Sequence, residues 1–371
     1  MRIVIGTGGT AGHIFPALAT GIRLRDRYGA EVVFAGTTSG QEATLVPKVG
    51  FRFESIEATP FHRRASLRTV LAPITALRAA GEARRFVRGA DAVLGMGGYV
   101  SVPVSLAARR EHVPLIVHEQ NAVLGLANRL AARWAATVAL SFREAGRHLP
   151  RGARAVTVGN PVRDPIVDAA GRRHELAVEG RERFGLEEGR RTILIFGGSQ
   201  GAVRLNNAVL ELCRLLHNRD DLQVLLVSGP RNHQALIERL PSPGRLLLRV
   251  LPFVERIELA YSVADLAIAR SGATTVAELC VCGVPSILVP YPYATANHQE
   301  ANARALERAG GAIVLLDEQT SGGALAALVD KLLEWPGRLP ALARAAREFG
   351  RPDAGDSLAG LVVSVAGEGR P

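Results

Sequence analysis

The chain has 371 residues, of which 47% are hydrophobic and 22% are charged. These proportions are ordinary for globular proteins, and the length favours two domains. No apolar run reaches the ~18 residues of a transmembrane helix, and the N-terminus has the character of a strand, so we expect neither a membrane span nor a signal peptide. The net charge of +10 comes almost entirely from arginine, which indicates either codon composition or an anionic partner.

Short β-like runs alternate with helical patterns along the whole chain. In the first half, strands are predicted near 2–6, 31–35, 92–95, 115–118, 137–140 and 155–158; in the second half, near 192–196, 223–228, 246–250, 266–269, 285–289 and 312–315. This alternation predicts an α/β fold with parallel sheets covered by helices on both faces.

The boundary between the two halves is predicted at residues 159–163, because Pro161 interrupts regular structure. A charged helical stretch, 164–185, follows it. A last amphipathic helix near 354–366 could return to the first domain. The three cysteines, Cys213, Cys280 and Cys282, are an odd number with one tight spacing, so we expect buried free thiols and neither disulfides nor a zinc site.

The segment 61–89 has a different character from the rest. Apolar residues recur at helical spacing (Leu67, Val70, Leu71, Ile74 and Leu77) among seven arginines (Arg63, Arg64, Arg68, Arg78, Arg84, Arg85 and Arg88). Such a helix can lie on an anionic membrane surface. The alternative, which the sequence alone favours, is a helix that packs on the core and turns a basic face to solvent.

The first predicted strand runs into the glycine loop Gly6-Thr7-Gly8-Gly9-Thr10-Ala11-Gly12-His13. Glycines let a backbone approach a phosphate, and a helix N-terminus then faces it. The next strand ends at Thr37 without the acid that a nicotinamide site needs, which argues against a dehydrogenase. The dipole at a helix start favours a neutral, proton-accepting imidazole, so His13 is either a base or a packing residue.

Two further glycine turns follow strands. The turn 95–99 is expected beside the first loop, where the pair could hold a diphosphate or could simply allow tight packing. The turn 197–201 also has the Gly-x-Ser-x-Gly spacing of a hydrolase nucleophile elbow, with Asp265 and His298 as candidate partners of Ser199. A hydrolase would leave the first half of the chain unexplained.

The segment from Arg270 to Glu278 follows another strand and opens a helix. The spacing of Thr275 and Glu278 matches a capping box, which is a purely structural device. The functional alternative is a helix N-terminus that holds phosphate while Glu278 accepts hydrogen bonds from sugar hydroxyls.

Taken together, these motifs are specific. In order they are Gly9-Thr10-Ala11-Gly12-His13-Ile14-Phe15-Pro16, Gly95-Met96-Gly97-Gly98-Tyr99, His118-Glu119-Gln120-Asn121, Gly159-Asn160-Pro161-Val162-Arg163, Gly197-Gly198-Ser199-Gln200-Gly201-Ala202, Arg270-Ser271-Gly272-Ala273 and His298-Gln299. The set resembles the bacterial UDP-N-acetylglucosamine–N-acetylmuramyl-(pentapeptide) pyrophosphoryl-undecaprenol N-acetylglucosaminyltransferase family over nearly the whole chain.

The resemblance implies a GT-B fold, with two Rossmann-like parallel-sheet domains facing across a cleft. Residues 1–162 with about 352–371 would form an acceptor-binding, membrane-associated domain, and residues 163–351 a UDP-sugar-binding domain. It implies an inverting transfer of N-acetylglucosamine from UDP-N-acetylglucosamine to the 4-hydroxyl of the muramyl sugar of lipid I, giving lipid II for peptidoglycan synthesis. It also implies peripheral attachment to the cytoplasmic face of the cell membrane, which shifts the expectation for 61–89 towards an anionic membrane surface.

The resemblance also implies roles for single residues. His13 would be the catalytic base, with Glu119 next in line. The donor would meet Thr10, Ala11, Gly12, Asn121, Arg163, Ser199, Gln200, Val254, Ala273, Thr274, Thr275, Glu278 and Gln299. The acceptor would meet Gly8, Gly9, Gly97, Gly98 and Tyr99.

Three positions depart from the family pattern: Ala11 stands for glycine, Val254 for isoleucine, and His298 for a glutamine beside Gln299. The chain has no Asp-x-Asp motif, and helix N-termini can stabilise a nucleotide leaving group, so we expect no metal and no cofactor. The expected partners are UDP-N-acetylglucosamine, lipid I and the membrane, and not nucleic acid. A hydrolase and a non-enzymatic nucleotide sensor remain as alternatives, and a transfer assay discriminates them.

Overall fold

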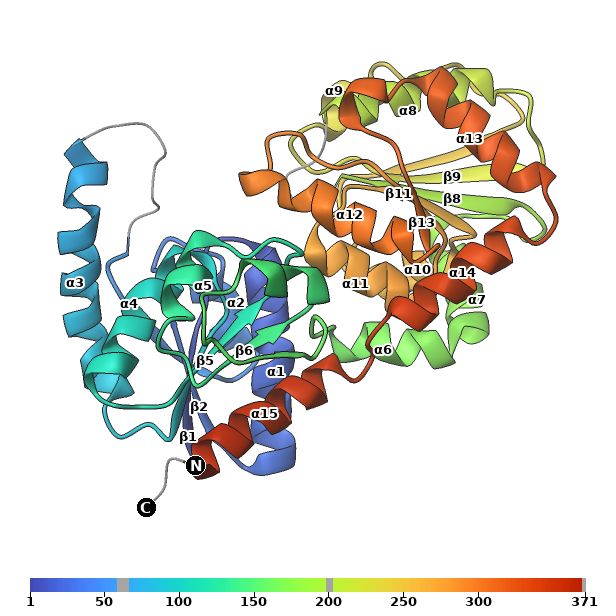
Figure 1. The fold of residues 1–371 in the computed structure, drawn as a ribbon. Coiled ribbons are helices and arrows are strands. Elements are labelled where there is room, and N and C mark those ends of the chain that lie inside the picture. Colours follow the sequence, from blue (N-terminus) through green and yellow to red (C-terminus); the bar gives the residue numbers. More distant parts are fainter. Residues whose placement is uncertain (59–66, 198–202, 369–371) are drawn as a thin grey trace. The chain divides into compact units, whose positions relative to one another are not determined.

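The structure, a computed structural model, describes residues 1–58, 67–197 and 203–368, with the side chains of 67–74 left out (Figure 1). The chain forms two compact units. The first comprises Met1–Arg163 together with Pro352–Pro371, and the second comprises Asp164–Arg351. Each unit is an α/β layer structure with its own parallel sheet and its own core.

The first unit has a seven-stranded sheet in the order β3-β2-β1-β4-β5-β6-β7. Its strands are β1 (Arg2–Gly6), β2 (Glu31–Gly36), β3 (Arg52–Ser55), β4 (Ala92–Gly95), β5 (Leu115–Glu119), β6 (Thr137–Leu140) and β7 (Ala155–Thr157). Its helices are α1 (Ala11–Tyr28), α2 (Glu42–Lys48), α3 (Leu67–Val87), α4 (Gly98–Arg110), α5 (Leu126–Ala131), the 3-10 helix η1 (Arg143–His148) and α15 (Ala354–Glu368).

Residues of the central strand β1 alternate between two cores. Ile3 and Ile5 point into the cluster that contains α1 and α15, whereas Val4 points into the cluster that contains α3 and α4. This alternation follows from the two-residue period of a strand. A sheet that is buried on both faces explains why these strands are continuous apolar runs.

Helix α15 closes the first unit from the far end of the sequence. It packs against α1. Asp356 of α15 forms ion pairs with Arg23 (3.2 Å) and Arg27 (2.8 Å) of α1. A Cβ atom on Gly355 would lie 2.6 Å from Nε of Arg23, so a larger residue there would force the Arg23 side chain to move.

The second unit has a six-stranded sheet in the order β10-β9-β8-β11-β12-β13. Its strands are β8 (Arg191–Phe196), β9 (Leu222–Val227), β10 (Leu247–Leu251), β11 (Leu266–Ala269), β12 (Ser286–Leu288) and β13 (Ala312–Val314). Its helices are α6 (Asp164–Gly171), α7 (Arg173–Phe184), α8 (Val203–Leu215), α9 (His233–Ile237), α10 (Ile257–Val263), α11 (Ala273–Cys282), η2 (Thr295–Asn297), α12 (His298–Arg308), η3 (Asp317–Gln319), α13 (Gly322–Glu334) and α14 (Arg338–Phe349).

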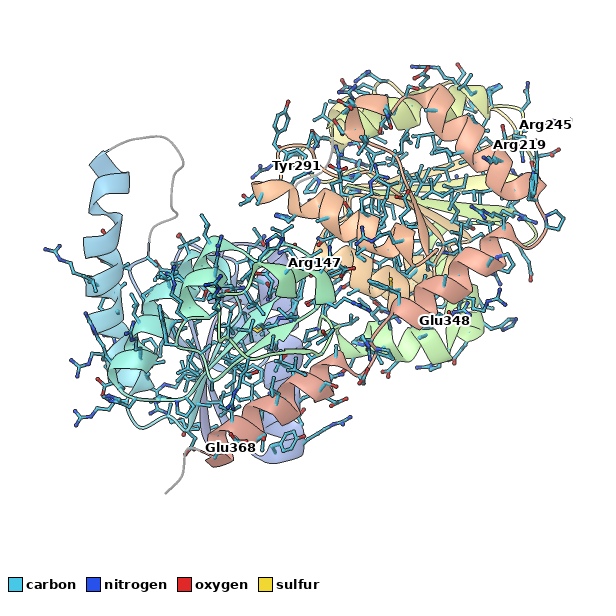
Figure 2. All side chains as sticks on the ribbon, in the orientation of Figure 1. Arg147, Arg219, Arg245, Tyr291, Glu348 and Glu368 are labelled. Carbon is cyan, nitrogen blue, oxygen red and sulfur yellow. The ribbon has the colours of Figure 1, made fainter. Side chains whose placement is uncertain are left out.

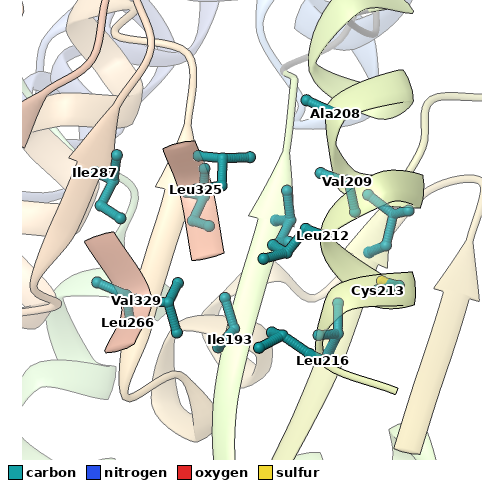
Figure 3. Packing of buried hydrophobic residues seen from close by; sticks show 14 of the residues in the cluster. Ile193, Ala208, Val209, Leu212, Cys213, Leu216, Leu266, Ile287, Leu325 and Val329 are labelled. Atoms are coloured by element: carbon teal, nitrogen blue, oxygen red, sulfur yellow. The ribbon is translucent and has the colours of Figure 1, made fainter. Parts of the chain in front are cut away.

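Helices α8 and α13 cover one face of this second sheet. Figure 3 shows Leu212 of α8, Leu216 just after α8 and Val329 of α13 converging on Ile193 of β8. On the other face, the ring of Tyr261 from α10 lies 6.1 Å from that of Phe196. The free cysteines are buried as predicted, and burial raises the pKa of the Cys213 and Cys282 thiols to about 12, so they stay protonated.

Much of the arginine surface is neutralised locally. Arg219 pairs with Asp221 (2.7 Å) and Asp330 (2.8 Å), and Arg245 lies 3.5 Å from Asp220. Figure 2 shows Arg219 and Arg245 at the outside of the second unit. Within residues 1–58, 67–197 and 203–368, no helix combines the length and apolar character that crossing a bilayer requires.

Candidate active site

The glycine loops lie at the two points where strand order reverses. In the first sheet, order reverses between β1 and β4, and the loops that follow these strands are Thr7–Thr10 and Met96–Gly97. In the second sheet, it reverses between β8 and β11, which run into the turns at Gly197 and at Arg270–Gly272. Open parallel sheets bind ligands in the crevice at these positions. The strand order confirms the prediction that the turn 95–99 lies beside the first loop. It also places the end of β8 at Gly197 beside the turn Arg270–Gly272, which the sequence did not predict.

In the first unit, the two glycine loops touch. Gly98 has a φ of +75°, and a Cβ atom there would lie 2.6 Å from the carbonyl oxygen of Gly8. A Cβ on Gly8 would collide with Glu42 and Val100, both at 2.6 Å. Side chains are therefore excluded from this contact, and the backbones of both loops can approach a ligand. Helices α1 and α4, both described in full, have no acid in their first turns, which suits an anion.

His13 lies in the first turn of α1, next to the second loop. A Cβ on Gly97 would lie 3.2 Å from Cε1 of the His13 imidazole, so the absence of a side chain at Gly97 leaves room for the ring. The Nδ1 atom of His13 lies 3.0 Å from the carbonyl oxygen of Met96 and 3.0 Å from Oε1 of Gln120. His13 is thus held between the loops by Met96, just after β4, and Gln120, just after β5, and its role as a base stays a prediction.

Glu119 is buried at the end of β5 and is occupied with hydrogen bonds. Its carboxylate accepts from the backbone of Asn121 (3.0 Å) and Gly125 (2.9 Å) and from the amides of Asn121 (3.2 Å) and Asn128 (2.8 Å). Four charge-assisted bonds fix the turn that follows β5. This geometry favours a positioning role for Glu119 over proton transfer.

Tyr99 presents its ring and hydroxyl beside the same loops. Its ring carbon lies 3.5 Å from the position of a Cβ on Gly9, and its hydroxyl lies 3.4 Å from Oγ1 of Thr37. Thr37 in turn donates to Oε1 of the fully buried Glu42 (2.9 Å). Sequence reasoning missed Glu42, because a single acid in a short helix carries no motif.

The remaining first-unit candidates surround this centre. Thr10 is the N-cap of α1, and Ala11 and Gly12 form its first turn. The Arg163 guanidinium carbon lies 4.5 Å above the centre of the Phe15 ring. These positions are compatible with the predicted donor contacts, which stay predictions.

In the second unit, the turn after β11 is held from several sides. Arg270 is buried; it donates to the carbonyls of Val289 (3.1 Å) and Pro290 (3.0 Å) and pairs with Asp317 at 2.7 Å. Ser271 donates to the Gln299 carbonyl at 2.8 Å. Asp317 also lies 3.7 Å from Arg204 at the start of α8. This one carboxylate therefore pairs with an arginine after β11 and with an arginine at the start of α8. Asp317 follows a strand with no motif around it, and only its partners reveal it.

The predicted capping box is wrong. Helix α11 begins at Ala273 with Gly272 as its N-cap, so Thr275 already lies inside the helix. Glu278 is buried one turn further on, where Oε2 accepts a hydrogen bond from the Tyr261 hydroxyl at 2.8 Å. Thr274 and Thr275 are half-buried in the first turn beside Ala273. Glu278 is therefore oriented by a neighbouring helix, and the N-cap position of its own helix is held by Gly272, not by Thr275.

Two of the predicted donor-binding residues lie in this unit near the turn, and two lie outside the residues that the structure describes. Gln299 is half-buried, and its Oε1 accepts from the backbone nitrogen of Tyr291 (3.0 Å). Val254 is buried between β10 and α10. Ser199 and Gln200 lie outside the described residues. In the described part of the chain, no three His, Cys, Asp or Glu side chains gather as metal ligands would.

The hydrolase alternative fails on geometry. Asp265 precedes β11, and its carboxylate accepts from the backbone nitrogen of Thr192 at the start of β8 (2.8 Å). Strands β8 and β11 are parallel neighbours, so Asp265 lies beside the start of β8. The turn at Gly197 follows the other end of β8. Asp265 therefore lies at the opposite end of the strands from Gly197, which argues against Asp265 as the partner of a nucleophile in the turn that follows Gly197.

Comparisons with known proteins agree with the geometry. Residues 3–140 match the N-terminal domain of glycosyltransferase family 28, and residues 192–358 match its C-terminal domain. The chain is 40% identical to the UDP-N-acetylglucosamine–N-acetylmuramyl-(pentapeptide) pyrophosphoryl-undecaprenol N-acetylglucosamine transferase of Halothermothrix orenii, over 99% of both chains. It is also 40% identical to the protein of that name from Moorella thermoacetica, over 100% of both chains.

Solved structures show the same architecture. The crystal structure of Acinetobacter baumannii MurG is similar with a TM-score of 0.78 and 30% identity, covering 98% of this chain and 99% of that one. The structure of Staphylococcus aureus MnaA with UDP has a TM-score of 0.67 at 15% identity, covering 96% of this chain and 94% of that one, and shows the fold alone. The predicted GT-B class, with two Rossmann-like parallel-sheet domains, is confirmed.

Proposed function

The chain belongs to the UDP-N-acetylglucosamine–N-acetylmuramyl-(pentapeptide) pyrophosphoryl-undecaprenol N-acetylglucosamine transferase family, and on this premise we propose which reaction it catalyses. It transfers N-acetylglucosamine from UDP-N-acetylglucosamine to the 4-hydroxyl of the muramyl sugar of lipid I. The product is lipid II, the disaccharide precursor for peptidoglycan synthesis, and the anomeric carbon is inverted.

The observation that carries this proposal is the contact between the two glycine loops beside His13. A side chain on Gly98 would collide with the Gly8 carbonyl, and a side chain on Gly8 would collide with Glu42 and Val100, so neither position accommodates one. Two helix N-termini without first-turn acids suit a diphosphate, and lipid I presents one next to its muramyl sugar. His13 adjoins that contact, which suits a base for the acceptor hydroxyl.

The residues of the first unit bind and activate the acceptor. Backbone groups of Gly8, Gly9, Gly97 and Gly98 meet the lipid diphosphate, and Tyr99 contacts the sugar. His13 takes the proton of the 4-hydroxyl while the hydroxyl oxygen bonds to the anomeric carbon, and UDP leaves with the electron pair of the bond that breaks. Such a base contributes about 10²–10⁴ to the rate.

The second unit binds the donor. The N-terminus of α11, at Ala273, Thr274 and Thr275, and the loop containing Ser199 and Gln200 stabilise the diphosphate of the leaving UDP. Glu278 accepts from ribose hydroxyls, Gln299 contacts the sugar, and the backbone of Val254 contacts uracil. From the first unit, Thr10, Ala11, Gly12, Asn121 and Arg163 complete the donor contacts.

Because the acceptor carries a polyprenyl chain, the enzyme works at a membrane surface. We assign it to the cytoplasmic face of the cell membrane as a peripheral protein, with α3 as the contact. The exposed side chains of Leu77 and Arg78 on that helix support this assignment.

The test incubates the full chain with UDP-N-acetylglucosamine and a lipid I analogue and follows release of UDP and formation of the disaccharide. We expect both products in equal amounts. His13→Ala should lower kcat by about 10²–10⁴, with the KM for UDP-N-acetylglucosamine close to that of the wild type. His148→Ala, at an exposed histidine of the same unit, is the matched control and should keep the full rate.

Two results would contradict the proposal. UDP release at the full rate without acceptor would indicate a hydrolase. A His13→Ala variant at the wild-type rate would show that the base lies elsewhere.

A further inference from the structure

Three side chains form a hydrogen-bonded chain that runs inward from His13. Oε1 of Gln120 lies 3.0 Å from Nδ1 of His13, and Nε2 of Gln120 lies 3.0 Å from Nδ1 of His118. Nε2 of His118 lies 3.0 Å from the carbonyl oxygen of Gly159. The Met96 carbonyl oxygen joins the chain, 3.0 Å from His13 Nδ1 and 2.8 Å from Gln120 Nε2. Gln120 and His118 are buried, so water does not compete for these bonds.

The inner end of the chain sets the direction of each bond. A carbonyl oxygen only accepts, so Nε2 of His118 carries the hydrogen that Gly159 receives. Burial lowers the pKa of His118 to about 4, so the ring is neutral at physiological pH and its Nδ1 atom accepts. The Gln120 amide must therefore direct its NH2 group towards His118, which also gives the Met96 oxygen a donor.

Only one tautomer of His13 fits the outer end. Gln120 Oε1 and the Met96 oxygen are both acceptors, so Nδ1 of His13 is the donor, and the lone pair of the neutral ring resides on Nε2. The opposite tautomer would direct the Nδ1 lone pair at two oxygen atoms, each 3.0 Å away. That arrangement loses the hydrogen bonds and adds repulsion.

We propose that Gln120 is a positioning residue for the transfer reaction. Its NH2 group donates to the neutral His118, which turns its oxygen towards His13. That oxygen holds His13 as the Nδ1–H tautomer, with Nε2 as the proton acceptor. When the acceptor proton reaches Nε2 and UDP departs, the imidazolium keeps its Nδ1–H on Gln120 and Met96. The inference rests on the proposed role of His13 as the base.

The tautomer can be observed without measuring activity. In the full chain labelled with 15N-histidine, long-range 1H–15N spectra distinguish the two neutral tautomers, and the His13→Gln spectrum assigns the signal of His13. We expect Nδ1–H for His13 and Nε2–H for His118. Gln120→Met keeps the length of the side chain but removes the amide. Only the Met96 carbonyl oxygen then favours Nδ1–H, so a share of His13 should shift to the Nε2–H form and give a mixture of tautomers.

Kinetics of the same variants connect the tautomer to the reaction. Gln120→Met should lower kcat by about 10–100-fold, as expected when a reacting group loses its orientation, with the KM for UDP-N-acetylglucosamine unchanged. Gln120→Glu retains an acceptor oxygen for His13, so it should keep the Nδ1–H tautomer and a higher kcat than Gln120→Met. If Gln120 had a purely structural role, kcat would fall equally in both variants.

Gln223→Met is the matched control. Gln223 is a buried glutamine of the second unit that accepts from the Glu187 backbone nitrogen (2.8 Å) and donates to Thr192 (2.9 Å). Its loss should reduce stability while leaving the His13 signal and kcat unchanged. A His13 tautomer unaffected by Gln120→Met overturns the inference, whatever His13→Ala does. A mixture of His13 tautomers in Gln120→Met with an unchanged kcat also overturns it. The rate of His13→Ala shows separately whether His13 is the base.

Discussion

Glu278 depends on α10 for its orientation. The carboxylate lies one turn inside α11, where the helix no longer has free backbone donors for it, and the Tyr261 hydroxyl supplies a bond of 2.8 Å instead. A buried acid whose geometry is fixed by a neighbour is arranged in advance to accept hydrogen bonds from a ligand.

Glu278→Gln should weaken the binding of UDP by about 10–150-fold, which corresponds to the ~1.5–3 kcal/mol of a hydrogen bond to a charged group. Tyr261→Phe should weaken binding in the same direction but less, because it frees the carboxylate without removing it. Titration calorimetry with UDP measures both. If Glu278→Gln lowers thermal stability and keeps the affinity, Glu278 is a structural residue.

His118 makes the stability of the first unit sensitive to pH. Its pKa is about 4 in the folded chain because of burial, against an ordinary value of 6.5. Above pH 6.5 neither state binds the proton and the contribution is complete. As pH falls from 6.5 to 4, only the unfolded state takes up the proton, so up to about 3 kcal/mol of folding free energy is lost. Below pH 4 both states are protonated and the loss stops.

The measurement uses one tryptophan of each unit. Trp335→Phe leaves Trp134 as a reporter of the first unit, and urea unfolding at several pH values then gives its stability. In this background, His118→Gln should flatten the pH dependence between pH 6.5 and 4, although it lowers stability at pH 7. His148→Gln, at an exposed site, should leave the slope as it was. Equal slopes in all three proteins would refute the assignment.

How much of the site the sequence predicts depends on whether a residue belongs to a motif. His13 and the glycines could be named because glycine turns after strands restrict where a ligand lies, whereas the role of Tyr99 came only from the family resemblance. Gln120 lies inside a recognised motif, yet its role follows only from the two histidines that it joins. Asp317 and Glu42 have no local signal, because their partners are far away in the sequence or lie in a loop of unremarkable composition.

At the scale of elements, apolar runs located all strands that lie inside a sheet. The missed strand, β3, is an edge strand of four residues in which Phe53 alone is apolar, so it has no periodicity to detect. The predicted helix 164–185 is two helices, α6 and α7, which meet at Arg172 in a non-helical conformation. Charged helices have a weak apolar pattern, so the break was invisible in the sequence.

The described half of α3 combines both interpretations of the segment 61–89. Ala83, Phe86 and Val87 pack into the core beside α4. Arg84 and Arg88 pair with Glu111, and Arg85 donates to the Ser55 carbonyl at 3.3 Å, so these arginines also hold the fold. Leu77 and Arg78 are exposed. Arg63 and Arg64 lie outside the described residues, as does the side chain of Arg68.

A membrane test should therefore change the arginines away from the Glu111 end of α3. Arg64→Glu, Arg68→Glu and Arg78→Glu together should weaken co-sedimentation with phosphatidylglycerol vesicles by about 100-fold or more, at ~1 kcal/mol for each arginine near the surface. The control changes Arg231, Arg338 and Arg344, exposed residues of the second unit, to glutamate and has the same net charge. Sedimentation that drops equally in both triple variants, or in neither, argues for a solvated basic face.

At the scale of the whole molecule, the chain crosses between its units twice, near Arg163 and near Arg351. The second crossing delivers α15 to the first core, where Leu358 and Val362 are fully buried. The stability of the first unit therefore depends on α15, and the second unit folds around a core of its own.

Separate cores predict that mutations and ligand act on different transitions. Leu358→Ala should destabilise the first unit by about 2–5 kcal/mol, and Leu325→Ala, a matched change in the second core, should do the same to the second unit. UDP at 100 times its Kd should stabilise the unit that binds it by about 2.7 kcal/mol. In scanning calorimetry, UDP should raise the transition that Leu325→Ala lowers and leave the one that Leu358→Ala lowers. If UDP instead moves the Leu358-sensitive transition, the donor site belongs to the first unit, and the assignment of Glu278 and Gln299 to the donor falls with it.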